Sequence, residues 1–377
     1  MNNLGIYIHI PFCIKKCNYC DFLTIIGSDQ PKIDEYVRYL CKEIILMKEY
    51  AQNKIVDTVY FGGGTPSLLS VNNINNIMNC INQHYNLSRD AEITIEINPE
   101  TIDENWVKEI SDSGINRASV GFQNSRQEIL NIIGRQGSNE HFIACIKWLN
   151  KYNITNISAD IILGLPLMDV DKTIDDANFI CELNIPHISA YSLILENRTK
   201  LYKQVNNGEI VLPSEDLERD IYHKFCDYVK SKGYHRYEVS SFCKNGYESR
   251  HNKKYWDLSE YLGLGLGASG LINNNRTKNP VRISEYYKRL DDHNTSFDVE
   301  YELSKNDMMS EYSFLAIRTS RGIDKNYFKN KFNVKFDDVF NLKIHEKNKL
   351  IVNDNNFVRL TDKGFDLSNL VEIDLLL

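Results

Sequence analysis

Residues 7–22 read Tyr7-Ile-His-Ile-Pro-Phe-Cys-Ile-Lys-Lys-Cys-Asn-Tyr-Cys-Asp-Phe22, close to the start of this 377-residue chain. The alternating apolar residues that lead into this segment predict a strand, and Pro11 ends it because proline cannot donate to a sheet ladder. Cys13, Cys17 and Cys20 therefore lie on a loop at a strand end. Three thiolates on such a loop can face one soft metal centre.

The number of thiols restricts which metal group this loop can hold. Structural zinc takes four ligands, and no fourth cysteine follows nearby, whereas three thiolates suit a [4Fe–4S] cluster with one iron left free. Zinc completed by a distant histidine, or by His9, stays open as an alternative. A disulfide framework does not fit nine cysteines spread over 377 residues. The other six are predicted to be small buried apolar residues: Cys41, Cys80, Cys145, Cys181, Cys226 and Cys243.

Composition and charge indicate a soluble globular protein. Hydrophobic residues make up 42% of the chain and charged residues 25%, which is ordinary for this class. The net charge of −7 argues against nucleic acid as the main partner. No basic segment precedes an apolar run at the start, and no run approaches the ~20 apolar residues of a membrane span. We expect a cytoplasmic location, with at most peripheral contact with a membrane.

Strand and helix patterns alternate through the first half of the chain. Strands are predicted near residues 5–10, 57–61, 92–97, 117–121, 157–163 and 187–193. Helices are predicted near residues 32–50, 71–84, 102–113, 125–132, 138–151 and 172–183. This alternation indicates right-handed β-α-β units and a parallel sheet. The predicted fold class is α/β, an open (β/α)6 partial TIM-type barrel whose ligands collect at the carboxyl ends of the strands.

The cysteine spacing C-x3-C-x2-C, with an aromatic residue before the third cysteine, resembles the signature of the radical S-adenosylmethionine (SAM) superfamily. The flanking Tyr-Ile-His-Ile-Pro-Phe narrows the resemblance to the coproporphyrinogen-dehydrogenase-like branch. The resemblance implies that the free iron of the cluster chelates the amino and carboxylate groups of SAM. It also implies an electron donor if SAM is cleaved to its radical, because the cofactors carry the chemistry.

Further segments resemble the SAM-binding motifs of this superfamily in the same order along the chain. They are Phe61-Gly-Gly-Gly-Thr-Pro-Ser67, the acid in Ile93-Thr-Ile-Glu-Ile97, Ser119-Val-Gly-Phe-Gln123, Gly134-Arg135 and Asp160-Ile-Ile-Leu-Gly164. The resemblance implies that SAM contacts Tyr7, Tyr19, Gly63, Gly64, Thr65, Glu96, Gln123, Arg135 and Asp160. A carboxylate such as Asp160 suits a ribose hydroxyl, and the fork of Arg135 suits a carboxylate. The family often has a histidine two residues after this arginine, where Gly137 stands here.

The second half of the chain resembles one subfamily. Residues 250–256, Arg-His-Asn-Lys-Lys-Tyr-Trp, resemble the His-Asn-x-x-Tyr-Trp motif of HemW-type haem chaperones. The resemblance implies that His251 binds haem iron, although a hydrogen-bonded loop histidine is the alternative. Phe22 stands where coproporphyrinogen dehydrogenases of the HemN type carry a fourth cysteine. Gly265-Leu-Gly-Ala-Ser-Gly270 matches a dinucleotide motif literally, but without a β-α-β unit it predicts only a tight backbone crossing.

The pattern changes again near residue 300. Helices are predicted near residues 304–319, 324–332 and 336–345, followed by a short hairpin and a final helix. We therefore divide the chain into a barrel core at 1–200, an extension at 201–299 and a mostly helical, winged-helix-like module at 300–377.

Together these features predict a haem chaperone that binds haem and transfers it to an acceptor protein, with a [4Fe–4S] cluster and SAM at the barrel. The alternative is an oxygen-independent coproporphyrinogen III dehydrogenase, which would use the SAM radical for oxidative decarboxylation. A third reading is a zinc-bound structural module. The missing fourth cysteine and the His251 motif favour the chaperone.

Overall fold

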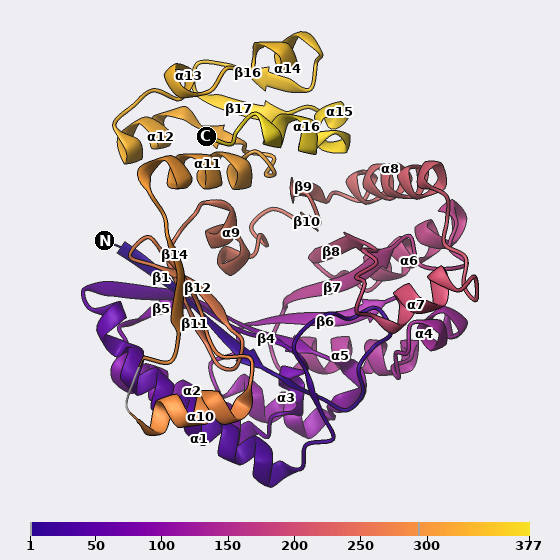
Figure 1. Cartoon of the computed structure of the whole chain (residues 1–377). Coiled ribbons are helices and arrows are strands. Elements are labelled where there is room, and N and C mark those ends of the chain that lie inside the picture. The colour runs from indigo at the N-terminus through magenta and orange to yellow at the C-terminus, as the bar shows by residue number, and fades with distance from the viewer. Residues whose placement is uncertain (1, 293–294) are drawn as a thin grey trace.

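The structure is a computed structural model that describes residues 2–292 and 295–377 (Figure 1). Its first half contains six parallel strands that alternate with helices, so the predicted (β/α)6 core is confirmed. The strands are β1 (Asn2–Ile10), β4 (Lys54–Gly63), β5 (Leu87–Ile97), β6 (Arg117–Gln123), β7 (Asn156–Leu163) and β8 (His187–Ser192). The helices are α1 (Gln30–Leu46), α2 (Val71–His84), α3 (Glu104–Ser111), α4 (Gln127–Ile132), α5 (Asn139–Lys151), α6 (Val170–Glu182), α7 (Lys200–Asn206) and α8 (Glu215–Ser231).

Helix starts follow from local sequence. Helices α2, α3, α5, α6 and α8 each begin after a Ser or Asp whose side chain accepts a hydrogen bond from a first-turn backbone N–H. Such caps typically contribute about 0.5–2 kcal/mol. The strands bury branched apolar residues on the barrel core, among them the fully buried Ile6 and Val59. Loops that leave the strand ends are therefore held on a rigid scaffold.

The sheet extends beyond the six predicted strands on both sides. β11 (Tyr261–Leu264) pairs in parallel with β1, and β12 (Ser269–Ile272), β13 (Asn275–Lys278) and β14 (Asp298–Glu302) continue the sheet in antiparallel pairs. At the other side, β10 (Ser241–Cys243) pairs with β8, and β9 (His235–Glu238) forms the edge. The proposed extension at 201–299 thus shares one twelve-stranded sheet with the barrel core.

The glycine-rich segment between β11 and β12 is a tight backbone crossing, as predicted. Gly265 has a positive φ of 96°, and a Cβ there would lie 2.6 Å from the carbonyl oxygen of His9. Only glycine allows the turn to approach the end of β1 this closely.

A buried carboxylate fastens this segment to the first helix. Glu43 of α1 accepts hydrogen bonds from the backbone N–H of Gly265 (2.7 Å), the amide of Asn279 (2.6 Å) and the hydroxyl of Tyr286 (2.6 Å). The side chain of Glu43 is fully buried. Tyr286 lies on α10 (Ile283–Asp291), so this cluster joins segments more than 200 residues apart in sequence.

Helix α9 (Arg250–Trp256) lies between the barrel and the C-terminal module (Figure 1). Its amino end is capped by the hydroxyl of Ser249 and by Glu92 of β5, whose carboxylate accepts from the backbone N–H of Arg250 (3.0 Å) and His251 (2.9 Å). An anion at a helix amino terminus is stabilised by the helix dipole. The helix is therefore held by charge as well as by packing.

The C-terminal module has its own apolar core. It contains α11 (Lys305–Ala316), α12 (Lys325–Phe332), a sheet in the order β15 (Ile323–Asp324), β17 (Phe357–Leu360), β16 (Ile351–Asn353), and the short α15 (Asp362–Asp366) and α16 (Ser368–Ile373). The predicted helix at 336–345 is two short helices, α13 (Phe336–Val339) and α14 (Lys343–Lys347). The winged-helix-like character is otherwise as predicted. No helix among the described residues has the length and apolar character needed to cross a membrane.

Candidate functional site

The three loop cysteines follow β1, as the sequence predicts. Cys13 ends the short strand β2 (Phe12–Cys13), which pairs with β3 (Ile25–Ile26), and Cys17 and Cys20 follow on the same loop. All three are half-buried. Burial raises the pKa of the Cys13 and Cys20 thiols, and the nearby thiol of Cys17 contributes to both shifts. The thiols therefore face a common region at the carboxyl end of the barrel.

The distances between the cysteine sulfurs distinguish an iron–sulfur cluster site from a site for a single zinc ion. In the part of the chain that the structure describes, the three cysteine sulfurs do not all lie within 4.8 Å of one another. Ligand sulfurs around one tetrahedral zinc ion would lie about 3.8 Å apart. His9 offers no free nitrogen, because its ring contacts the Tyr7 hydroxyl (3.0 Å) and the carbonyl of Leu23 (3.3 Å). The donor set fits a [4Fe–4S] cluster, which is larger and needs only three protein thiolates.

The glycine-rich segment after β4 packs directly on the cysteine loop. Gly63 has a φ of 112°, and a Cβ there would lie 2.5 Å from the His9 ring. A Cβ at Gly64 would lie 2.8 Å from the carbonyl of Phe12. Close approach thus requires glycine at both positions. The next residue, Thr65, is buried and places its hydroxyl 3.3 Å from Cys13 Sγ.

Glu96 lies beside this glycine segment. Its carboxylate accepts hydrogen bonds from the hydroxyl of Tyr60 (2.9 Å) and from the backbone N–H of Gly63 (3.1 Å). Burial, with the charge of Asp160 as the next cause, raises the pKa of Glu96 to about 7. The structure thus brings Gly63 and Glu96, which the sequence assigns to the same ligand, into direct contact with each other.

Asp160 points into the same region from β7. Its two oxygens accept from the hydroxyl of Ser119 (3.0 Å each), and one also accepts from Ser158 (3.2 Å). Burial raises the pKa of Asp160. A carboxylate that is buried and only partly saturated by hydroxyls retains acceptor capacity for a ligand.

Gln123 and Arg135 lie at the end of β6 and on the following segment. Gln123 has a φ of 63°, in the left-handed region, next to a register shift in the β6–β7 pairing. Arg135 is buried, lies 3.5 Å from Glu100 and contacts the carbonyl of Gly121 at 3.4 Å. Burial opposes the charge of Arg135, but Glu100, and after it Tyr19 and Cys17, raise its pKa. Arg135 thus connects the cysteine loop to the β6 end.

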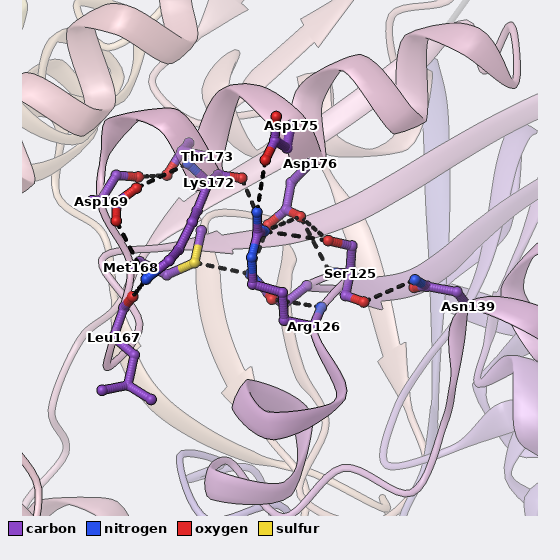
Figure 2. A network of polar contacts seen from close by, with 11 residues as sticks. Ser125, Arg126, Asn139, Leu167, Met168, Asp169, Lys172, Thr173, Asp175 and Asp176 are labelled. Carbon is purple, nitrogen blue, oxygen red and sulfur yellow. Dashed lines mark hydrogen bonds and ion pairs between the residues drawn. The ribbon is translucent and has the colours of Figure 1, made fainter.

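The loop after Gln123 is held by a buried carboxylate on α6 (Figure 2). Asp176 accepts from the amide of Asn124 (2.6 Å) and from Arg126 (3.0 Å), and it also binds the hydroxyl of Ser125. Burial raises the pKa of Asp176 to about 6. This network fixes the backbone that directly follows Gln123.

Sequence reasoning missed several polar partners of this site. Tyr60 contacts Glu96, and Glu100 contacts Arg135. The amide of Asn98 donates to Thr65 (3.1 Å). The missed residues are Tyr60, Asn98, Glu100, Ser119 and Ser158. Ser158 stands two residues before Asp160 and so shares its strand face, which was the one signal available. Of the remaining predicted SAM residues, Tyr7 contacts His9, and Tyr19 lies on the cysteine loop.

His251 is fully buried and is linked to Glu96 through Tyr60, which contacts both side chains. Its Nδ1 contacts the hydroxyl of Thr58 (2.8 Å), its Nε2 contacts the hydroxyl of Tyr255 (2.9 Å), and its ring stacks on Tyr60 at 5.2 Å. Burial lowers the pKa of His251 to about 3, so the imidazole is neutral. In this conformation both ring nitrogens have protein partners, which corresponds to the hydrogen-bonded alternative more closely than to an open iron ligand.

A cavity of about 700 Å³ lies beside α9. It is bounded by the amino ends of β1 and β4, by α9, by β12 and by α11 and α12 of the C-terminal module. Its basic lining residues are Arg250, Lys253, Lys254 and Lys331, and Leu258, Leu271, Leu303 and Met308 are apolar. The cavity lies at the end of the strands opposite to the cysteine loop.

Comparisons with known proteins agree with this geometry. Residues 7–180 match the family described as the radical SAM superfamily, and residues 303–367 match the HemN C-terminal domain. Coproporphyrinogen III oxidase (HemN) from Escherichia coli, described as a radical SAM enzyme, has a similar fold, with a TM-score of 0.86. That likeness covers 99% of this chain and 90% of the other, at 22% sequence identity.

Curated relatives identify a narrower family within this superfamily. The protein named heme chaperone HemW from Lactococcus lactis is 36% identical over 366 residues, covering 96% of this chain and 94% of the relative. Its namesake from Bacillus subtilis is 32% identical and covers 96% of each chain. Because the alignments cover nearly the full length of both chains, the whole molecule is related to these proteins and not one domain alone. The chain therefore belongs to the HemW family, within the radical SAM superfamily.

Proposed function

We propose that this protein binds haem and passes it to an acceptor protein, with a [4Fe–4S] cluster and SAM bound at the carboxyl ends of the barrel strands. The name of its full-length relatives, heme chaperone, supports the proposal. We place its action in the cytoplasm, where thiols stay reduced.

Cys13, Cys17 and Cys20 would hold the cluster, and Gly63, Thr65, Glu96, Gln123, Arg135 and Asp160 would surround SAM together with Tyr7, Tyr19 and Gly64. When bound, these groups supply one-electron chemistry. The chain itself contributes orientation: Glu96 is held by Tyr60 and Gly63, and Asp160 by Ser119 and Ser158. Both carboxylates are positioned before a ligand arrives, which lowers the cost of ordering on binding.

The cavity beside α9 is the observation that carries the haem part of the proposal. Its volume of about 700 Å³ lies inside the range of roughly 300–1,000 Å³ typical of ligand sites. Arg250, Lys253 and Lys331 can pair with the propionate carboxylates of haem. Leu271 and Leu303 offer apolar surface to the macrocycle.

The iron ligand follows from which donors reach this cavity. Met308 and Tyr327 line it, and thioether and phenolate are both known ligands of haem iron. His251 does not line the cavity, so it can ligate only if its Nε2 leaves the hydroxyl of Tyr255, which holds it at 2.9 Å, and the ring turns toward the cavity. We therefore propose that haem binding by His251 is coupled to movement of Tyr255.

Haem titration followed by the Soret band tests this site. Lys253→Glu and Lys331→Glu should each weaken haem binding several-fold, because each reverses a charge at the cavity. Lys232→Glu is the matched control, since this exposed lysine lies after α8, away from the cavity. Equal affinity in all three variants would remove the cavity from the proposal. His251→Ala should lower haem affinity while cluster and SAM binding persist. An unchanged Soret spectrum would indicate that Met308 or Tyr327, rather than His251, binds the haem iron.

The enzymatic alternative has a direct test. Phe22, which stands at the fourth-cysteine position, is exposed at the loop surface. The reconstituted protein, with reductant and SAM, should therefore leave coproporphyrinogen III unchanged. Formation of protoporphyrinogen IX would replace the chaperone assignment with oxidative decarboxylation.

A further inference from the structure

Three potential metal ligands gather at the far edge of the sheet, away from the cysteine loop. His235 on β9 and Cys243 on β10 are direct partners in the antiparallel register. Glu248 follows β10 on the loop that leads into α9. The ligand atoms of these three residues all lie within 4.8 Å of one another, and no other group of three His, Cys, Asp or Glu residues in the described ranges does so.

The spacing of these atoms matches a single tetrahedral ion. Cys243 Sγ lies 3.7 Å from His235 Nε2, and His235 Nε2 lies 3.1 Å from Glu248 Oε1. With ordinary zinc bond lengths, tetrahedral geometry places sulfur and nitrogen about 3.6 Å apart, and nitrogen and oxygen about 3.4 Å apart. Both observed separations differ from these values by only a few tenths of an ångström.

A simple ion pair between His235 and Glu248 would not explain why a thiol joins them. His223 also pairs with a carboxylate, Asp366, at 3.2 Å on the surface, but no cysteine sulfur among the described residues lies within 4.8 Å of both ligand atoms. At the sheet edge a third donor is added, because the buried thiol of Cys243 points at the same nitrogen of His235 that contacts Glu248. Convergence of thiol, imidazole and carboxylate on one point is the donor pattern of a zinc site.

We propose that His235, Cys243 and Glu248 form a binding site for a borderline-soft divalent transition metal ion of the zinc class. A thiolate and an imidazole disfavour Mg²⁺ and Ca²⁺, which prefer oxygen ligands. Three protein ligands leave a fourth position for water. The side chains of His235 and Glu248 are 40% and 28% exposed, so an ion can enter from solvent while Cys243 forms the buried floor.

Occupancy of this site would fix the loop between β10 and α9. Glu248 immediately precedes Ser249, whose hydroxyl caps α9. An ion shared by β9, β10 and Glu248 would therefore hold the amino end of the helix against the sheet. The site is separate from the proposed cluster, SAM and haem sites, so its test does not depend on any of them.

Cobalt titration provides the test. The full-length protein with all three loop cysteines replaced by serine should bind one Co²⁺ per chain. The complex should show a thiolate-to-cobalt charge-transfer band, and Zn²⁺ should displace it. Absence of the band at saturating Co²⁺ would overturn the proposal.

Two variants and one control assign the ligands. Cys243→Ser should abolish the charge-transfer band, and Glu248→Gln should lower Zn²⁺ affinity by at least the roughly 10–100-fold that loss of an outer partner costs. His223→Ala, which removes the surface pair without a thiol, should bind Zn²⁺ as the parent does. If Cys243→Ser fails to fold, Glu248→Gln decides, since its side chain is partly exposed. A band that survives Cys243→Ser, or unchanged Zn²⁺ affinity in Glu248→Gln, would refute the site.

Discussion

Raising the pH from 6 to 8 should tighten SAM binding by about tenfold through ionisation of Glu96, whose pKa burial and Asp160 raise to about 7. The direction of this pH effect follows from the raised pKa of Glu96. Below pH 7 the free protein holds Glu96 mostly as a neutral acid, and above pH 7 mostly as a carboxylate. A carboxylate accepts more strongly from the amino group of a ligand than a neutral acid does.

The magnitude comes from the ionised fraction of Glu96. With a pKa of about 7 it is roughly one-tenth at pH 6 and nine-tenths at pH 8, a ratio of about ten. A glutamate with the ordinary pKa near 4.3 would already be ionised throughout this range and would give no step. The raised pKa is therefore what makes binding pH-dependent near neutrality.

Calorimetric titration of SAM into cluster-loaded protein at pH 6, 7 and 8 measures the effect. Glu96→Gln is the matched control. Any titration of SAM or of the cluster occurs in both proteins, whereas the amide that replaces the Glu96 carboxylate does not titrate. The ratio of wild-type to variant affinity should rise about tenfold across the range. Asp160→Asn should shift the step to lower pH, since the Asp160 charge contributes to the raised pKa. Parallel profiles for wild type and Glu96→Gln would refute the reasoning.

Three further changes have defined outcomes. Asp160→Ala should weaken SAM binding by about 1–3 kcal/mol, measured by calorimetry, because its ligand and serine partners lose a buried acceptor. Replacing all three loop cysteines with alanine should abolish the brown visible absorption of thiolate-bound iron, and a fully reconstituted cluster would contradict the assignment. Glu43→Gln should lower the free energy of unfolding by about 1–3 kcal/mol in urea titrations, because its amide cannot satisfy all three buried donors, whereas the exposed Glu49→Gln should change it little.

The sequence was sufficient for the six strand–helix units, because each carries a strong local period and most of their helices begin with a side-chain cap. It was not sufficient for β11, which has only four residues, includes Gly263 and is followed directly by Gly265. Its parallel partner is β1, more than 250 residues earlier, so no local pattern reports the pairing. β9 and β10 pair with each other locally, but with four and three residues they are too short to show a strand period.

The candidate site was predicted unevenly for a similar reason. The cysteines and strand-end carboxylates could be proposed as site residues because the family motifs and strand ends mark them. Their supporting residues, such as Tyr60 and Ser119, were not, since hydroxyls on strands have no distinctive spacing. His251 was located by motif, but its burial against Thr58 depends on tertiary packing that the motif does not encode.

The carboxylate of Glu43 has a consequence for synthesis on the ribosome. Its partner Gly265 is made 222 residues later, which at about 5–20 residues per second is a delay of roughly 10 to 45 seconds. Over the same interval one edge of β1 has no β11 to pair with. A nascent chain that has emerged only as far as the sixth strand thus exposes an unpaired strand edge, and its Glu43 lacks the donors Gly265, Asn279 and Tyr286. Because an unpaired strand edge invites pairing with other chains, we expect the nascent chain to need protection from aggregation until β11 has been made.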